Sequence, residues 1–180
     1  MKNKKKLISI IVNCYNGEKF LRESLASIQN QEYKNWELIF WDNKSKDNSK
    51  KILFNFKDKR IRYFKSKKFV NLYKARNLAI KKARGKFLCF LDTDDWWDKN
   101  KLRFQVNLIK QNKKASFIYS NFYIYDQDKK SKKLNFNKQL PEGQVTQFLL
   151  NNYKLGIITV MIKKKLFNNK KFNEKYNIIG

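Results

Sequence analysis

Three aspartates crowded into a short stretch near the middle of the chain are the residues best suited to do chemistry. Residues 86–97 read K-F-L-C-F-L-D-T-D-D-W-W, with Asp92, Asp94 and Asp95 directly after an apolar run. The whole chain has only fifteen acidic residues, so an acidic composition does not explain the grouping. Carboxylates this close repel one another unless a cation or solvent compensates their charge. The stretch therefore predicts a divalent metal site.

The composition narrows the choice of metal. The chain contains no histidine, and its two cysteines, Cys14 and Cys89, lie far apart in the sequence. Zinc prefers nitrogen and sulfur ligands, so a zinc site is not expected. Aspartate oxygens suit Mg²⁺ or Mn²⁺, which one or two carboxylates hold while substrate phosphates and waters complete the coordination. The cluster thus points to a metal-bound diphosphate substrate.

Helix capping is the plainer explanation of the same aspartates. Aspartate is favoured at helix N-caps and beside the positive end of the helix dipole, and a helix is expected to begin near Asp98. On this explanation the cluster binds no ligand. The choice depends on where the other strands of the fold end.

The elements that must position the aspartates alternate between strands and helices. Apolar-rich runs predict strands at 7–12, 36–41, 61–64 and 87–91, of which the first and the last are expected to be buried on both faces of the sheet. Between them, apolar residues at three- and four-residue steps predict helices, whose clearest inward faces are Phe20, Leu21, Ser24, Leu25 and Ile28, and Leu72, Ala75, Arg76, Ala79, Ile80 and Ala83. The alternation implies right-handed crossovers, and hence an α/β fold with a doubly wound, mainly parallel sheet and helices on both faces.

Ligands of doubly wound sheets bind outside the carboxyl ends of the strands. That rule places the turn 13–17, Asp42 and the 92–95 cluster along one rim, which favours a ligand site over helix capping. Arg76 is the only charged member of its helix face. It either lies at the edge of the buried stripe or points into the cleft.

The rest of the chain is less regular. We expect a helix at 98–110, a strand at 115–125, a turn at 141–143, a short helix at 145–150 and a strand at 156–162. Gly85 is expected to end the helix before the aspartate strand, and Ser45 or Asp47 to cap the helix that includes residues 52–56. Because no repeat and no flexible linker divides the chain, residues 1–180 are predicted to form a single domain.

The strongly basic composition supports a second hypothesis. Forty-two basic residues against fifteen acidic ones give a formal net charge of +27, which attracts any polyanion. A basic RNA- or DNA-binding module, with Trp96, Trp97 or tyrosines stacking on bases, is therefore the alternative function. The lysines are spread over nearly every segment, however, and a dedicated nucleic-acid surface should be more local. We consider nucleic acid a less favoured partner.

No segment predicts a membrane span or a signal peptide. The basic residues 1–6 lead into only six apolar-rich residues, 7–12, before polar Asn13. Two cysteines give no disulfide framework, as expected in a reducing compartment. We expect a cytoplasmic protein whose basic surface can hold it peripherally against the anionic inner leaflet of a membrane.

Four stretches in order resemble the family 2 glycosyltransferases, inverting enzymes of GT-A fold that use nucleotide-diphospho-sugars. They are V-N-C-Y-N-G-E-K-F-L, E-L-I-F-W-D-N-K-S-K-D-N-S, Y-K-A-R-N-L-A-I and F-L-D-T-D-D-W-W. The chain departs from the family pattern where Asn13 replaces a proline and where Asn43 and Lys44 replace an aspartate and a glycine. The resemblance runs from residue 7 to about residue 110, and weakly onward to residues 171–174.

The resemblance implies a role for each matching residue. Asp42 corresponds to the aspartate on the nucleobase, Asp92 to one near the ribose, and Asp94 to the ligand of the metal that bridges the diphosphate. The substrate-binding residues expected on this basis are Asp42, Asp92, Arg76, Asp95 and Tyr15, with Asp94 and Asp92 as metal ligands. The implied cofactor is Mn²⁺ or Mg²⁺, the donor is a nucleotide-diphospho-sugar such as a UDP-sugar, and the acceptor is a growing polysaccharide or a lipid-linked glycan.

A general base does not emerge from the sequence. An inverting transfer needs a carboxylate to take the proton of the attacking hydroxyl. In this family that carboxylate usually follows a segment similar to F-N-E-K-Y-N-I-I-G, which here occupies residues 172–180 at the end of the chain. Glu174 lies in the matching motif, so it is expected to be structural. The chain therefore resembles either the donor-binding part of a longer enzyme, without that enzyme's acceptor portion, or an inactive donor-binding fragment.

Overall fold

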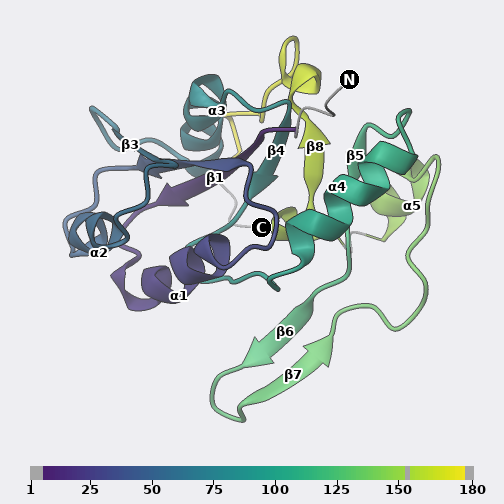
Figure 1. Cartoon of the computed structure of the whole chain (residues 1–180), viewed down its shortest axis with the longest axis horizontal. Helices are drawn as coiled ribbons and strands as arrows, with labels where there is room; N and C mark the ends of the chain where they lie inside the picture. Colours follow the sequence, from purple (N-terminus) through teal and green to yellow (C-terminus); the bar gives the residue numbers. More distant parts are fainter. Residues whose placement is uncertain (1–5, 153–154, 177–180) are drawn as a thin grey trace.

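The computed structural model describes residues 6–152 and 155–176 and contains a six-stranded sheet with the order β3-β2-β1-β4-β8-β5 (Figure 1). β8 runs antiparallel to both of its neighbours, whereas the first four strands in this order are parallel. The mainly parallel α/β sheet is thus confirmed. The strands are β1 (Ile8–Cys14), β2 (Trp36–Asp42), β3 (Ile61–Lys65), β4 (Phe87–Phe90), β5 (Phe117–Ile118) and β8 (Met161–Lys163).

Helices cover both faces of this sheet. β1 shows the division, because Ile8 and Ile10 belong to the core under α1, α2 and α4, whereas Ile11 belongs to the core under α3. Alternate residues of a strand point to opposite faces, so the apolar residues of one buried strand serve both layers. The doubly wound arrangement is therefore confirmed. The helices concerned are α1 (Glu18–Gln29), α2 (Ser49–Asn55), α3 (Leu72–Lys82) and α4 (Lys101–Gln111).

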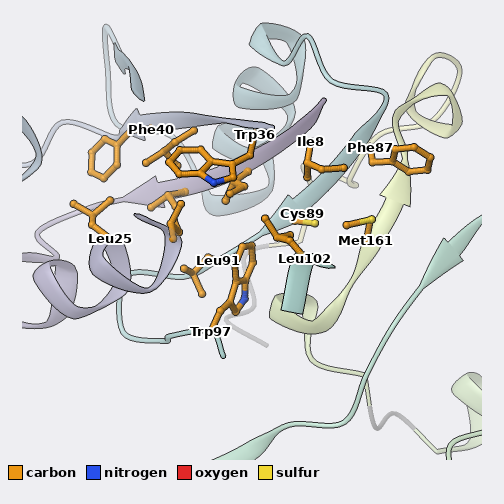
Figure 2. Close-up of a cluster of buried hydrophobic side chains, with 14 of the residues drawn as sticks. Ile8, Leu25, Trp36, Phe40, Phe87, Cys89, Leu91, Trp97, Leu102 and Met161 are labelled. Carbon is orange, nitrogen blue, oxygen red and sulfur yellow. The ribbon is translucent and has the colours of Figure 1, made fainter. Parts of the chain in front are cut away.

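The larger of the two cores fixes the helices that carry the rim loops. Leu25 of α1 and Leu102 of α4 meet Phe40 and Ile8 of the sheet in this cluster (Figure 2). All four side chains are at most 2% exposed. Complete burial of a leucine or isoleucine contributes about 1.5–3 kcal/mol, so this layer anchors α1 and α4 firmly against the strands.

The second half of the chain departs from the predicted strand at 115–125. After β5 the chain leaves the sheet, and β6 (Tyr123–Asp126) pairs with β7 (Ser131–Leu134) in a hairpin that projects from the body (Figure 1). The side-chain amide of Asn121 donates to the carbonyl of Phe136 at 2.5 Å, which ties the two ends of this excursion together. The prediction of one strand was wrong because the alternating sequence pattern does not stop where β5 ends. Between β5 and β6 the chain leaves the sheet, and the side chain of Asn121 bonds to the chain after β7.

Other boundaries in this half also moved. The strand predicted at 156–162 is limited to Met161–Lys163, because Thr159 bonds back to the carbonyl of Gly156 and Ile157–Thr159 form a 3-10 turn. The helix predicted at 98–110 begins only at Lys101. The short helix predicted at 145–150 is present as α5 (Thr146–Asn151), and a second 3-10 turn covers Lys164–Phe167.

Gly85 does not end a helix as predicted. α3 stops at Lys82, and Ala83 is already extended, with φ −68° and ψ 138°. A Cβ at Gly85 would lie 2.7 Å from the carbonyl oxygen of Leu7 and from the backbone nitrogen of Ser9. Glycine is required there because the chain passes directly against β1, not because of a left-handed turn.

No helix in the part of the chain that the structure describes combines the length and the apolar composition needed to cross a bilayer. Residues 1–5 of the lysine-rich segment 1–6 and residues 177–180 of the segment 172–180 lie outside the described residues.

Candidate functional site

Three strand ends meet at the carboxyl edge of the sheet, as the sequence predicted. Cys14 at the end of β1 pairs with Asp42 at the end of β2, and Ile11 pairs with Phe90 at the end of β4. The backbone N–H of Leu91 also donates to the carbonyl of Ile11, so the aspartate loop leaves the sheet beside β1. The turn after β1, Asp42 and the aspartate cluster therefore share one rim.

Asp42 lies at this carboxyl edge of the sheet and is buried, with an exposed fraction of only 2%. Its Oδ1 accepts from the backbone N–H of Ser45 at 2.7 Å, and its Oδ2 accepts from the hydroxyl of Tyr63 at 2.7 Å. Burial first, and then the hydrogen bond and charge of Asp42, raise the pKa of Tyr63 well above its ordinary value. The carboxylate is thus held in a fixed orientation by the fold.

The turn after Asp42 keeps a shape that glycine would favour, although it contains no glycine. Lys44, which stands where the resembling family has glycine, adopts a φ of 70°. Asn43 ties this turn to the loop before α3, because its side-chain amide donates to the carbonyl of Val70 at 2.7 Å and accepts from the N–H of Val70 at 3.2 Å. The replacements at positions 43 and 44 therefore preserve a closed turn.

Hydrogen bonds join the turn after β1 to the start of α2. Ser49 Oγ accepts from the N–H of Gly17 at 3.0 Å, and Asp47 Oδ2 accepts from the N–H of Glu18 at 2.9 Å. The predicted cap of α2 is partly correct: Asp47 Oδ1 bonds to the N–H of Ser49, but the N-cap residue is Asn48, and Asp47 also caps α1. Sequence spacing could not have shown this shared use of one carboxylate.

Arg76 points toward the aspartate cluster at the carboxyl edge of the sheet, which decides between the two orientations left open by its sequence position. Its side chain is 8% exposed, and its Nη2 lies 3.0 Å from Oδ1 and 3.3 Å from Oδ2 of Asp92. The rings of Tyr73 and Phe172 each lie 6.0 Å from the guanidinium carbon. The arginine is thus a buried cation that neutralises one member of the aspartate cluster.

The other two aspartates have no such cation. Asp94 is exposed and Asp95 is half-buried, and among the described residues neither carboxylate has an ion pair. Burial, followed by the charges of Asp94 and Asp92, raises the pKa of Asp95 to about 6. Oxygen ligands with uncompensated charge fit a divalent cation.

The coordination that these residues offer is incomplete. Within residues 6–152 and 155–176, no three histidine, cysteine, aspartate or glutamate side chains are grouped to hold a metal. A Mg²⁺ or Mn²⁺ ion held by one or two carboxylates would need substrate oxygens and waters to complete its coordination.

The hydrogen bonds at the start of α4 weaken the capping explanation. Asp98 Oδ1 accepts from the N–H of Asn100 at 2.8 Å, and Asn100 is the N-cap residue. None of the hydrogen bonds of the described residues links a carboxylate of the 92–95 cluster to the first turn of this helix. Asp98 therefore orders the residues before α4, and in the described part of the chain the carboxylates of the 92–95 cluster take no part in this capping.

Tyr15 lies on the same rim, directly after β1. It is 50% exposed, and its ring centre is 4.7 Å from that of Phe69 in the loop before α3. The two rings form an aromatic surface between the turn after β1 and α3. A flat base or sugar can pack on such a surface.

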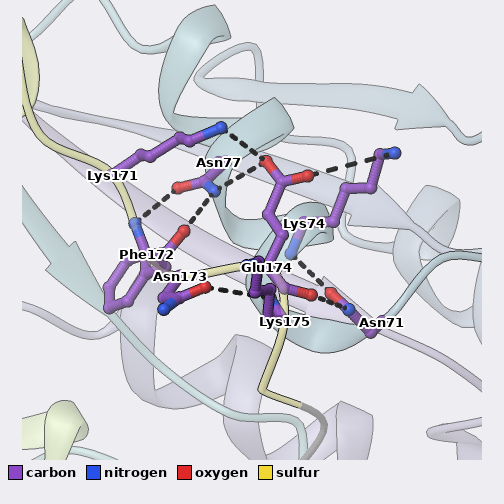
Figure 3. Close-up of polar contacts among 8 residues, drawn as sticks. All are labelled: Asn71, Lys74, Asn77, Lys171, Phe172, Asn173, Glu174 and Lys175. Carbon is purple, nitrogen blue, oxygen red and sulfur yellow. Dashed lines mark hydrogen bonds and ion pairs between the residues drawn. The ribbon is translucent and has the colours of Figure 1, made fainter.

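The segment containing Glu174 is bound to α3 (Figure 3). The amide of Asn77 donates to Oε1 of Glu174 at 3.1 Å and to the carbonyl of Phe172 at 2.9 Å, and it accepts from the N–H of Phe172 at 3.0 Å. Asn71 and Lys74 add a hydrogen bond and a 3.9 Å ion pair to the same glutamate. Sequence reasoning missed Asn77, although its place beside Arg76 in the A-R-N stretch was the available signal.

The comparison with protein families and curated relatives is specific. The model described as Glycosyl transferase family 2 matches residues 9–176. The chain is 34% identical over 168 residues to an Escherichia coli protein named UDP-Glc:alpha-D-GlcNAc-diphosphoundecaprenol beta-1,3-glucosyltransferase WfgD, covering 90% of this chain and 62% of that protein. The chain therefore spans less than two thirds of this relative's length.

Solved structures show the same fold. S. aureus TarS 1–349 in complex with UDP matches with a TM-score of 0.75 and 23% identity, over 94% of this chain and 51% of that one. Mannosyltransferase PcManGT from Pyrobaculum calidifontis, in complex with GDP-Man and Mn²⁺, matches with a TM-score of 0.55 and 20% identity, over 59% and 33% of the two chains. The predicted GT-A fold is confirmed by the first of these matches.

Proposed function

The chain belongs to the family 2 glycosyltransferases, and we propose that it binds a nucleotide-diphospho-sugar for inverting transfer of the sugar to a polysaccharide or lipid-linked acceptor. UDP is the proposed nucleotide, since WfgD is named as using UDP-Glc and the TarS structure holds UDP. The general base stays unassigned. Because the chain spans only part of its relatives' length, the proposal made from the rim concerns donor binding.

One observation carries this proposal: the fold brings a fixed carboxylate, a buried arginine and uncompensated aspartates to one rim. Asp42, held by Tyr63 and Ser45, presents a preoriented acceptor to a nucleobase. Arg76 orients Asp92, which we assign to the ribose. Tyr15 and Asp95 complete the proposed donor site, and preorganised polar groups of this kind fix the orientation of a ligand.

We assign Asp94 and Asp92 as the ligands of Mn²⁺ or Mg²⁺. The uncompensated charge around Asp95 supports this assignment. A divalent cation bound there supplies positive charge that stabilises the diphosphate as a leaving group. The protein's own part is to hold Asp92 against Arg76 and to leave Asp94 exposed for the ligand.

Titration calorimetry with UDP tests the proposal. We expect UDP to bind in the presence of Mn²⁺ and to lose at least about tenfold in affinity in EDTA, because the cation compensates the diphosphate charge. Asp94→Ala should cause a similar loss. Asp128→Ala, at an exposed aspartate in the turn of the β6–β7 hairpin, is the matched control. Equal UDP affinity with Mn²⁺ and with EDTA would reject the metal assignment.

The cellular setting is part of the proposal. The name of WfgD specifies a diphosphoundecaprenol-linked acceptor, so a lipid-linked glycan is a reasonable acceptor for this chain too. A basic protein that acts on such a substrate would work on the cytoplasmic side, in peripheral contact with anionic lipid. The formal charge of +27 supports that contact.

A further inference from the structure

A groove of about 490 Å³ opens beside the aspartate cluster. It runs between the outer side of α1 and the loop that follows the cluster, and it is lined by Glu23, Ala26, Ser27, Asn30, Trp96, Trp97 and Lys99. The hydroxyl of Ser24 donates to the carbonyl of Asp92 at 3.2 Å, which fixes α1 against the start of that loop. Trp96 directly follows Asp95, so the loop that carries the aspartates continues into one wall of the groove.

Aromatic side chains extend this groove toward the β6–β7 hairpin. The ring of Trp96 is 38% exposed and packs edge-on against Tyr125 of β6, with 5.4 Å between the ring centres and an angle of 80°. Tyr123 shares a face of β6 with Tyr125, because alternate residues of a strand point the same way. The exposed fractions of Tyr123 and Tyr125 are 63% and 37%. Three aromatic rings thus follow one another outside the core.

The chemistry of the groove selects among ligands. Its only charged side chains are Glu23 and Lys99, whose charges cancel, whereas the whole chain carries +27. This balance does not favour a polyanion. The amide of Asn30 and the carboxylate of Glu23 offer both donors and acceptors beside the indole of Trp96. Hydroxyl-rich rings with flat C–H faces match such a mixture, since they stack on aromatic rings and hydrogen-bond at their edges.

We propose that this groove and the Trp96–Tyr125–Tyr123 row bind the glycan chain of the acceptor, as a neutral oligosaccharide of two or more residues. The inference rests on the proposed function for its biological sense, but it concerns residues outside the donor site. Successive side chains on one face of β6 lie ~6.6 Å apart, a spacing that lets consecutive sugars meet consecutive rings. The groove then holds such a chain against the loop that continues from the aspartate cluster.

Binding of the defined oligosaccharides cellotetraose and chitotetraose tests this, measured by saturation-transfer NMR and calorimetry on the chain as it is. We expect at least one to bind saturably and a monosaccharide to bind more weakly. Trp96→Ala and Tyr123→Ala should each weaken binding roughly two- to tenfold, the effect of removing one stacked ring. Phe104→Ala, at an exposed aromatic on the outer face of α4, should leave the affinity unchanged.

UDP binding with Mn²⁺ in the same samples separates this inference from the proposed function. Tyr123→Ala should retain UDP affinity while losing oligosaccharide affinity. If UDP binds and neither tetrasaccharide does, or if both tyrosine and tryptophan variants bind sugar like the wild type, the glycan site is refuted and donor binding stands. If the variants instead abolish binding to anionic vesicles or self-association, with sugar binding unaffected, the row is a contact of that other kind and the proposal is also refuted.

Discussion

The carboxylates at the two edges of the parallel sheet differ in whether the fold supplies partners for their charge. At the amino edge, Glu37 is 6% exposed and its oxygens accept from Ser9 Oγ at 2.6 Å, from the N–H of Arg84 at 2.5 Å and from Arg62 Nη1 at 2.7 Å. At the carboxyl edge, Asp95 has two aspartates as neighbours and, among the described residues, no ion pair. Both groups are partly desolvated, but only the first has its charge matched by the fold.

The pKa shifts express this difference. Burial raises the pKa of Glu37, but hydrogen bonds from Ser9, Arg84 and Arg62 outweigh burial and place the pKa below its ordinary value. Burial also raises the pKa of Asp95, and there the neighbouring charges raise it further, to about 6. Glu37 stabilises the fold and has its hydrogen-bond donors within the protein. Asp95 has no such donors for its charge among the described residues, and a bound ligand that supplies positive charge explains its position better.

Replacement of the amino-edge carboxylate should have the largest effect on stability. Glu37→Ala leaves the buried hydroxyl of Ser9, the backbone N–H of Arg84 and the guanidinium of Arg62 without their acceptor, so we expect a loss of about 3 kcal/mol in the free energy of unfolding. Asp95→Asn should not lower it, because the change removes repulsion. Urea denaturation of the two variants measures both. A destabilisation by Asp95→Asn as large as that by Glu37→Ala would break the contrast between the edges.

Asp42 tests whether a carboxylate can serve both fold and ligand. Asp42→Asn should weaken UDP binding by about 1–3 kcal/mol if the carboxylate accepts a buried hydrogen bond from the base. Tyr63→Phe removes the hydroxyl that bonds to Asp42 Oδ2 but keeps the ring, and it should change UDP affinity much less. Calorimetry with UDP compares the two. An unchanged affinity in a folded Asp42→Asn protein would reject base recognition by Asp42.

The pH dependence of stability should reveal Glu37. Because its folded pKa is depressed, its stabilisation is complete above the ordinary pKa of 4.5 and is lost as pH falls through the lower folded value. Glu37→Gln should therefore lie furthest below the wild type in stability at pH 6, and the gap should shrink toward pH 3. Thermal unfolding across this range provides the measurement. A gap that widens in acid would contradict the assigned partners.

A change in salt concentration should have the smallest effect on UDP affinity. It distinguishes nucleotide binding at the rim from polyanion binding to the basic surface. A nucleic-acid module that neutralises six to ten phosphates loses roughly a thousandfold or more in affinity between 50 and 200 mM salt. UDP bound with Mn²⁺ in a cleft should lose far less, because burial limits screening. Titrations of UDP and of single-stranded RNA at both salt concentrations distinguish them. Tight RNA binding at high salt, without competition from UDP, would favour the nucleic-acid hypothesis.

The positions of the strands and the rim could be predicted from the sequence because they depend on local pattern. Runs rich in apolar residues identify the strands, and strict alternation with helices leaves few possible topologies. Asp42 and the 92–95 cluster were placed on one edge by that topology alone. The inward position of Arg76 also followed from helical spacing, although spacing did not decide where its guanidinium points.

Long-range pairing was decided only by the tertiary structure. Glu37 has partners up to 47 residues away, at Arg84, and Asn77 has partners 95 and 97 residues away, at Phe172 and Glu174. Nothing local distinguishes such a carboxylate or amide from a surface residue, since its burial depends on which segments the fold brings together. The chain's excursion into the hairpin has the same cause. An alternating pattern predicts a strand, but only the available neighbours determine whether that strand joins the sheet or, like β6, pairs in a hairpin and packs Tyr125 against Trp96.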